Sequence, residues 1–179
     1  MNRENLISLL ESYRPVDSDE RQYKESILNF INDNNIIFGK GNKKGHITAS
    51  AWIVNKDRSK VLLAHHNKLD RWMQLGGHTE EDENVLQGAY REAQEESGLA
   101  NIKPISEQIF DIDVHIIPQH KEESPHFHYD IRFAFEAESD ETPRVSNESK
   151  DVKWVAVEEI CQYTHERSVL RMAEKQIKP

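Results

Sequence analysis

The segment from Gly76 to Leu99 reads GGHTEEDENVLQGAYREAQEESGL and lies near the middle of a 179-residue chain. Between Glu80 and Glu96 it holds seven carboxylates and a single cation, Arg91, which gives it a formal balance of −6. Such a concentration of like charge is costly unless water or a bound cation relieves the repulsion. The segment therefore indicates a site for a cation, or a strongly solvated acidic surface.

The second half of this segment predicts a helix over residues 84–97. This stretch contains no proline, and Gly98 follows it as a typical helix stop. Apolar residues recur at intervals of three and four, namely Val85, Leu86, Ala89 and Ala93. These residues predict the buried face of the helix.

Three glutamates of the predicted helix share one face. At about 100° per residue, Glu92, Glu95 and Glu96 fall within an arc of about 100°. Carboxylate oxygens gathered in this way suit a hard divalent cation such as Mg²⁺ or Mn²⁺. The preceding Gly76-Gly77 pair allows a sharp backbone turn that brings a carbonyl close to the same ion.

The spacing resembles the Nudix box, which is glycine, five residues, glutamate, seven residues, Arg-Glu, an apolar residue, any residue, Glu-Glu, any residue, glycine and an apolar residue. Its positions fall, without departure, on Gly77, Glu83, Arg91, Glu92, Ala93, Glu95, Glu96, Gly98 and Leu99. The resemblance covers residues 46–165. It implies an α/β fold, a Nudix-like α/β/α sandwich with a mixed sheet, and metal-dependent hydrolysis of a nucleoside diphosphate linked to another moiety.

The resemblance also implies roles for individual residues. Glu92, Glu95 and Glu96 are the expected metal ligands, and a carbonyl of Gly76 or Gly77 completes the set. Glu83 and Arg91 are expected to pair and hold the loop against the helix. Many family members use a further glutamate from a later loop, as metal ligand or general base, and Glu148 is the candidate here. The alternative is that Glu148 is an exposed loop carboxylate with no role in the site. The expected catalytic residues are Glu95, Glu96 and Glu148.

Other residues are candidates for contact with the substrate. They are the histidine inside the box, His78; aromatic residues that can stack on a base, Trp72, Phe127 and Tyr129; and cations that can bind phosphate, Lys68, Arg71 and Arg132. Trp52 and Trp154 are expected in the core. His126 and His128 lie two apart and share a face of a predicted strand, a geometry that permits a transition-metal site.

Composition narrows the class of protein. The net charge of −9 argues against non-specific binding to nucleic acid or to an anionic membrane. The single cysteine, Cys161, excludes an internal disulfide and is typical of a reducing compartment. We expect a cytoplasmic enzyme whose partner is a small molecule, and homodimers are common among the proteins that it resembles.

Periodicity predicts a helical N-terminal extension over residues 1–40, packed on a single hydrolase domain over residues 41–179. Ser18 or Asp19 is the expected N-cap of its second helix. The predicted elements are helices over 4–13, 18–34 and 84–97, strands over 46–54, 60–65, 105–117, 126–137 and 151–157, and a final helix over 158–178 that breaks near residues 163–164.

Two other functions fit the same fold. One is an isomerase of diphosphate compounds that resembles isopentenyl-diphosphate isomerase, but that family needs a reactive cysteine just before its box-like segment, where this chain has Trp72 to Leu75. The other is a non-catalytic nucleotide sensor, but such modules typically lack box glutamates, and all of them are present here.

Overall fold

The computed structural model describes residues 3–80, 84–119, 124–138 and 142–177. Its helices are α1 (Arg3–Ser12), α2 (Ser18–Asp33), α3 (Val85–Ser97) and α4 (Arg167–Ile177), with 3₁₀ turns η1 (Gly39–Gly41) and η2 (Val157–Gln162). Its strands are β1 (Gly45–Val54), β2 (Lys60–His66), β3 (Arg71–Met73), β4 (Leu75–His78), β5 (Ile102–Pro104), β6 (Asp111–Ile117), β7 (His126–Ala137) and β8 (Ser149–Ala156).

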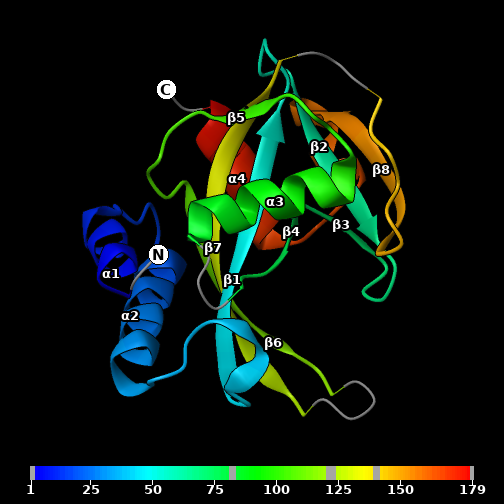
Figure 1. Ribbon diagram of the computed structural model, residues 1–179. Coiled ribbons are helices and arrows are strands. Elements are labelled where there is room, and N and C mark those ends of the chain that lie inside the picture. Colours follow the sequence, from blue (N-terminus) through cyan, green and yellow to red (C-terminus); the bar gives the residue numbers. More distant parts are fainter. Residues whose placement is uncertain (1–2, 81–83, 120–123, 139–141, 178–179) are drawn as a thin grey trace.

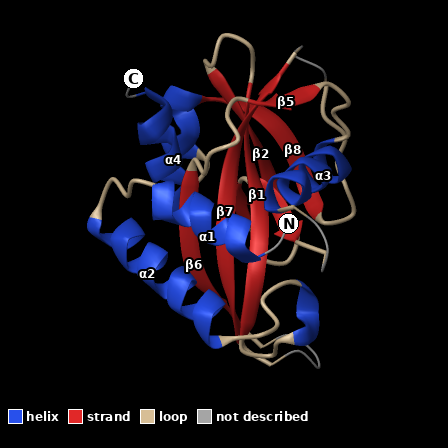
Figure 2. Ribbon diagram, turned by 60° about the vertical axis from the view of Figure 1, so that its left-hand side comes forward, coloured by secondary structure: helices blue, strands red, loops and turns tan. Residues whose placement is uncertain are grey.

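These eight strands form one mixed sheet in the described part of the chain. The order β3-β2-β1-β7-β5 runs across it, while β4 pairs with β1, β6 with β7, and β8 with β2. β1 and β7 run parallel, and the other pairs are antiparallel. α3 covers one face and α4 the other (Figures 1 and 2). The predicted α/β sandwich with a mixed sheet is therefore confirmed.

β1 is the centre of the sheet, and all ten of its residues are buried. Successive side chains of a strand point to opposite faces. Accordingly, Ala49 and Ala51 belong to the apolar cluster that contains Ala93 of α3, whereas Trp52 belongs to the cluster that contains Met172 of α4. One strand thus anchors both helical layers.

The two N-terminal helices contribute Leu6, Leu10, Ile27 and Phe30 to the larger core cluster. α2 lies along β6, beside the sheet (Figure 2). Its N-cap is Asp17, whose side chain accepts a hydrogen bond from the Glu20 amide. The expected N-caps, Ser18 and Asp19, are therefore wrong by one and two residues. The division of the chain at residue 40 stays a prediction.

A buried ionic network joins α2, β6 and α4. Arg171 donates to Asp111 Oδ1 and Oδ2 at 2.8 and 2.9 Å and lies 3.1 Å from Glu20 Oε1. Lys175 donates to Asp111 Oδ2 at 2.8 Å. Burial acts to raise the pKa of Asp111, but the hydrogen bond from Arg171 and the charges of Arg132 and Lys175 outweigh it and lower that pKa to about 2.

Some element boundaries differ from those predicted. The strand expected over 105–117 begins only at Asp111, because Ile109 and Phe110 pack into the core from a loop while residues 102–104 form β5. Residues 66–74, which the sequence predicts as a loop, contain β3, and this short strand pairs with β2. The predicted break near residues 163–164 is confirmed, since η2 ends at Gln162 and α4 begins at Arg167.

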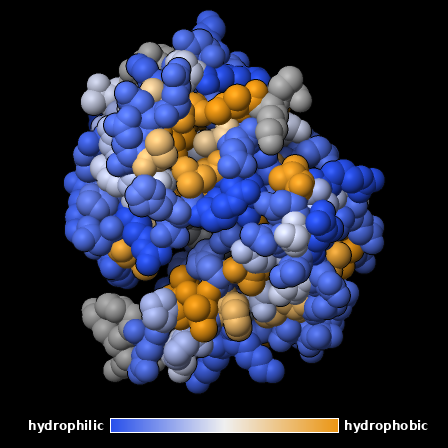
Figure 3. Space-filling model, turned by 180° about the vertical axis from the view of Figure 1, so that it is seen from behind, coloured by the Kyte–Doolittle hydropathy of each residue, from blue (hydrophilic) through white to orange (hydrophobic). Residues whose placement is uncertain are grey.

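The face shown in Figure 3 is mostly hydrophilic, with hydrophobic residues in small separate groups. None of the helices in the described ranges is long and apolar enough to cross a membrane.

Candidate active site

The site begins with α3, whose two ends are fixed by local hydrogen bonds. The Asn84 side chain accepts from the Leu86 amide at 2.9 Å, and Gly98 adopts a left-handed conformation (φ 67°) while its amide donates to the Gln94 carbonyl. Ala89 and Ala93 are buried. The helix predicted over 84–97 is thus confirmed, and its packing on β4 brings Glu92 and Glu96 to the glycine pair.

The glycine pair of β4 allows this close approach. The Gly76 amide donates to Glu96 Oε2 at 2.9 Å. At Gly76 (φ 153°) a Cβ atom would lie 2.6 Å from the Ala49 carbonyl oxygen, and at Gly77 it would lie 2.7 Å from Glu92 Oε2. A side chain at position 76 would push β4 away from β1, whereas one at position 77 would displace the Glu92 carboxylate.

The glutamates form a crowded acidic site. Burial, then the charges of Glu92, Glu148 and Glu95, raise the pKa of Glu96 to about 7, although the Gly76 amide opposes the shift. Burial also raises the pKa of Glu92 against the opposing effect of Arg91. Oxygen donors that carry like charge and lie close together fit a hard divalent cation, which would favour their ionised forms.

Arg91 lies among these carboxylates. Its Nη1 donates to Glu92 Oε1 at 2.8 Å and to Glu95 Oε2 at 3.2 Å, and its Nη2 donates to the His78 carbonyl at 2.9 Å. Arg91 therefore connects α3 to the end of β4 and holds Glu92 and Glu95 in place. Glu83, its expected partner, lies outside the described residues.

Glu148 lies in the turn before β8 with an exposed side chain. Its charge contributes to the raised pKa values of Glu92 and Glu96, which places it within electrostatic range of the box. The Asn67 amide donates to the Glu148 carbonyl, and the Asn67 side chain to the Asn147 carbonyl, each at 2.8 Å. Asn67 could not be predicted from the sequence, because these contacts join residues about 80 positions apart.

Arg132 does not fit the phosphate-binding role expected of it. The side chain is only 1% exposed. It donates to Asp130 Oδ2 at 2.7 Å and to Asp111 Oδ1 at 3.1 Å, and lies 3.3 Å from Asp113 Oδ2. Three buried carboxylates thus satisfy the guanidinium on the α4 side of the sheet, and the expectation for Arg132 is wrong.

The other cations and Trp72 lie around the turn between β2 and β3. Lys68 is exposed, and Arg71 forms a surface ion pair with Glu166 at 2.9 Å. The Trp72 ring stacks on His65 with the centroids 5.0 Å apart, and the Lys153 ammonium lies 4.7 Å from the Trp72 ring centroid. Of Lys68, Arg71 and Trp72, Lys68 therefore has the side chain that these contacts constrain least.

The expected aromatic residues of β7 line a groove. Tyr129 stacks on Phe30 of α2 with the centroids 4.1 Å apart, and the Phe127 side chain is exposed. Together with Ile116 they border a groove of about 710 Å³ between α2 and the β6–β7 pair. As expected, Trp52 is buried, while Trp154 is partly buried against the core.

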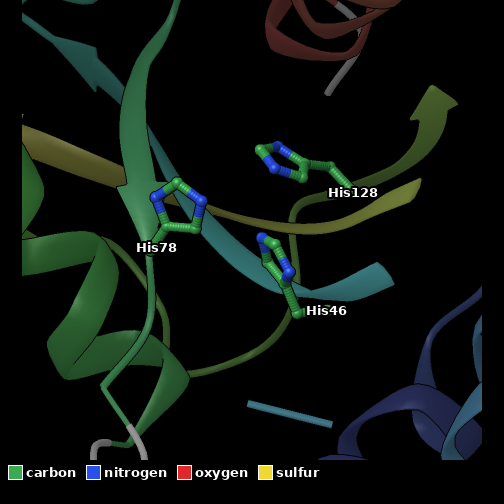
Figure 4. Close-up of side chains that lie close together, drawn as sticks. All are labelled: His46, His78 and His128. Carbon is green, nitrogen blue, oxygen red and sulfur yellow. The ribbon is translucent and has the colours of Figure 1, made fainter. Parts of the chain in front are cut away.

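A histidine cluster is formed by residues of β1, β4 and β7. His46 of β1, His78 of β4 and His128 of β7 turn their rings toward one another (Figure 4), and one ring nitrogen of each lies within 4.8 Å of the others. Burial, then the charges of neighbouring histidines, lower the pKa of His128 to about 2, so its imidazole is neutral. His78 and His128 were singled out in the sequence, but His46 was not.

Comparison with known proteins gives consistent matches. Residues 44–175 match the family model of the NUDIX domain. Phosphatase NudJ of Escherichia coli strain K12 is 30% identical over 130 residues, which are 71% of this chain and 78% of that protein.

Solved structures with the same fold include the following two. The crystal structure of a NUDIX-family hydrolase from Clostridium perfringens aligns with a TM-score of 0.55 and 27% identity, covering 73% of this chain and 95% of that one. The NUDIX domain of Shewanella oneidensis NrtR, solved with ADP ribose, aligns with a TM-score of 0.55 and 17% identity over 83% of this chain and 94% of that one.

Proposed function

We propose that this chain, which belongs to the Nudix hydrolase family, cleaves the diphosphate linkage of a nucleoside diphosphate joined to another moiety, with Mg²⁺ or Mn²⁺ as cofactor. The observation that carries the proposal is the crowding of Glu92, Glu95 and Glu96 beside the glycine strand, which raises the pKa of Glu96 to about 7. A bound divalent cation would supply charge neutralisation for the diphosphate and for these carboxylates.

In this proposal the box glutamates hold the cation. Glu96 is positioned by the Gly76 amide, and Glu92 faces Gly77 closely enough that a backbone carbonyl of the glycine pair can join the ligand set. Arg91 has to release Glu92 and Glu95 or share them with the cation, because its Nη1 contacts both. In either case, the hydrogen bond from Arg91 Nη2 to the His78 carbonyl holds α3 against β4.

Glu148 is the proposed general base. Two observations support this role: the Glu148 side chain is exposed, and its charge acts on Glu92 and Glu96. A carboxylate of this kind would accept a proton from an attacking water. Asn67 fixes the backbone of this loop through two hydrogen bonds, which limits the positions that Glu148 samples. Lys68, next to Asn67, supplies a nearby exposed cation for phosphate.

For the rest of the substrate, the groove between α2 and the β6–β7 pair is the candidate. It holds an exposed phenyl ring, Phe127, and the ring of Tyr129, both suited to contact with a base. The neighbours in structure include an Ap4A hydrolase of C. elegans and a domain solved with ADP ribose. Both compounds belong in the substrate panel.

The test measures the release of phosphate-containing products from a panel of substrates, each assayed with Mg²⁺, with Mn²⁺ and with chelator. The panel contains ADP-ribose, diadenosine tetraphosphate, nucleotide sugars and oxidised nucleoside triphosphates. We expect cation-dependent cleavage of at least one compound, and its loss in the Glu96→Gln variant. Cleavage that persists unchanged in this variant would contradict the proposed ligand set.

The same assay separates the rival functions. An isomerase would convert a diphosphate substrate without releasing phosphate, and its cysteine is lacking before the box, since Cys161 lies exposed in η2. A sensor would bind a nucleotide without turnover. Retention of all three helix glutamates favours hydrolysis over both.

The proposal extends to the setting of the enzyme. We propose a cytoplasmic location and a small-molecule partner, without nucleic-acid or membrane binding, because the chain carries a net charge of −9. A homodimer is tested by sedimentation of the purified protein.

A further inference from the structure

The histidine cluster is a product of strand register. His46 lies opposite His128 in the β1–β7 pair, and His128 lies opposite His115 in the β6–β7 pair. β4 brings in His78, which pairs with Thr48, two residues from His46. The rings of His46, His78 and His128 have centroids 4.8 to 5.2 Å apart. Three strands thus present imidazoles to a single point (Figure 4).

The interior of this cluster is unusual for histidine. His46 is 3% exposed. The Nε2 atom of His128 is buried, and among the described residues it has no hydrogen-bond partner. A buried polar atom without a partner costs about 1–3 kcal/mol, which indicates that a group outside the protein normally satisfies it.

The cluster lies apart from the acidic site. Gly77 and His78 are consecutive on β4, so their side-chain directions point to opposite faces of the strand. The Cβ direction of Gly77 meets Glu92, whereas the ring of His78 meets His46 and His128. Carboxylate donors gather on one face, and imidazole donors on the other.

We propose that His46, His78 and His128 bind a transition-metal ion of the zinc class, at a site separate from the carboxylate site. Zinc accepts imidazole nitrogens at about 2.0–2.1 Å in tetrahedral geometry, which places ligand nitrogens about 3.4 Å apart. The present separations, up to 4.8 Å, close to that value through ring rotations that move each nitrogen by about 1 Å. Mg²⁺ prefers oxygen donors and is not expected here.

Two further histidines border the cluster. The Nδ1 atoms of His115 and His126 each lie 2.9 Å from an acceptor, Asp113 Oδ2 and the Ser124 carbonyl respectively. Their ring centroids lie 5.5 and 5.2 Å from that of His128, in edge-on and tilted arrangements. These two rings form the surroundings of His128 and are not proposed as ligands.

A pocket of about 210 Å³, lined by Lys40, Asn42, Lys43, Ser124 and His126, opens beside His46 and His78. It gives an ion a path from solvent and leaves room for a fourth ligand, such as water, on that side. Three protein ligands with one open position are typical of exchangeable zinc sites.

The experiment measures metal binding by the whole protein, independently of hydrolysis. After treatment with chelator, the chain is titrated with Zn²⁺, Co²⁺ and Mg²⁺, and bound metal is counted by elemental analysis after dialysis. We expect one Zn²⁺ per chain, a visible Co²⁺ absorption band typical of tetrahedral nitrogen ligation, and a rise in unfolding temperature with Zn²⁺.

Variants assign the site. His78→Asn and His128→Asn should each lower Zn²⁺ affinity at least tenfold and abolish the Co²⁺ band, whereas His165→Asn, an exposed histidine in the turn before α4, serves as the matched control. Circular dichroism and unfolding without metal verify that each variant is folded. Should one of them be misfolded, His46→Asn replaces it and should lower Zn²⁺ affinity in the same way.

A Glu92→Gln, Glu96→Gln double variant separates this proposal from the proposed function. It should lose hydrolysis yet keep the Zn²⁺ stoichiometry and the Co²⁺ band. Equal Zn²⁺ binding by the wild type and the folded His128→Asn variant, or loss of the Co²⁺ band in the double glutamate variant, would overturn the histidine site without touching the hydrolase proposal.

Discussion

Exchange of Glu96 for glutamine is expected to stabilise the metal-free protein at pH 8 and to abolish hydrolysis. Glu96 is 6% exposed and lies among Glu92, Glu95 and Glu148, so its ionised form is unfavourable in the folded protein. Glutamine cannot ionise, but its side-chain oxygen can still accept the hydrogen bond from the Gly76 amide. The variant therefore removes the charge and keeps the local geometry.

The magnitude follows from the pKa of Glu96. A rise from 4.5 to about 7 corresponds to about 3 kcal/mol at roughly 1.4 kcal/mol per pH unit. Because the folded state holds this proton more tightly than the unfolded chain, stability falls as the pH rises from about 4.5 to about 7. The variant lacks this loss. It should match the wild type near pH 4 and exceed it by up to about 3 kcal/mol at pH 8.

The assay is thermal and urea unfolding in chelator, at pH 4 and at pH 8. For a chain of this size the gain at pH 8 corresponds to about 6–12 °C in Tm. Glu95→Gln is the matched control: Glu95 is on the same helix but exposed, so its replacement should change stability by less than about 0.5 kcal/mol. Added Mg²⁺ should stabilise the wild type at pH 8 and leave Glu96→Gln nearly unchanged.

Two results would refute this reasoning. If Glu96→Gln is no more stable than the wild type at pH 8 without metal, the carboxylates are not crowded as the structure places them. If Glu95→Gln gains as much, the effect reflects the general charge of the helix rather than the buried position of Glu96.

Three further substitutions test other parts of the structure. Arg171→Met should lower the free energy of unfolding in urea by about 3–5 kcal/mol, because it leaves Asp111 without its main partner. The control is Arg167→Met, in an exposed pair on the same helix, which should lower it by less than about 1 kcal/mol. Equal losses in the two variants would contradict the buried network. Gly77→Ala should displace the Glu92 carboxylate and raise the Mg²⁺ concentration for half-maximal activity by about tenfold or more with little loss of stability; an unchanged Mg²⁺ dependence would remove Gly77 from the site. Glu148→Gln should lower kcat more than it raises KM, and an unaltered kcat would exclude it as the base.

The box helix could be predicted because its signals are local. Asn84, the apolar spacing of Ala89 and Ala93, and Gly98 lie within fifteen positions, and each acts on its own segment. The strand expected from residue 105 was less accurate, since alternation of apolar residues does not distinguish a strand from a loop whose side chains enter the core, as those of Ile109 and Phe110 do.

Residues that act through long-range contacts could not be assigned in this way. Arg132 has the charge of a phosphate ligand, and the pairing of β6 with β7 brings Asp111 and Asp113 to its guanidinium, from about 20 positions away in the sequence. Asn67 and His46 are ordinary polar residues in the sequence. Their roles depend on a loop contact and on strand register, neither of which has a signature in the surrounding residues.

β4 connects the two clusters of metal-binding groups, and this connection has a physical consequence. Arg91 binds both the box carboxylates and the carbonyl of His78, the residue whose ring belongs to the histidine cluster. An ion that fixes the His78 ring also restrains the backbone next to Gly77, where Glu92 approaches most closely. Because β4 is then already restrained, less conformational entropy is lost when the carboxylates gather around a cation. The two clusters are therefore expected to be coupled through β4, with imidazole ligation favouring cation binding by the glutamates.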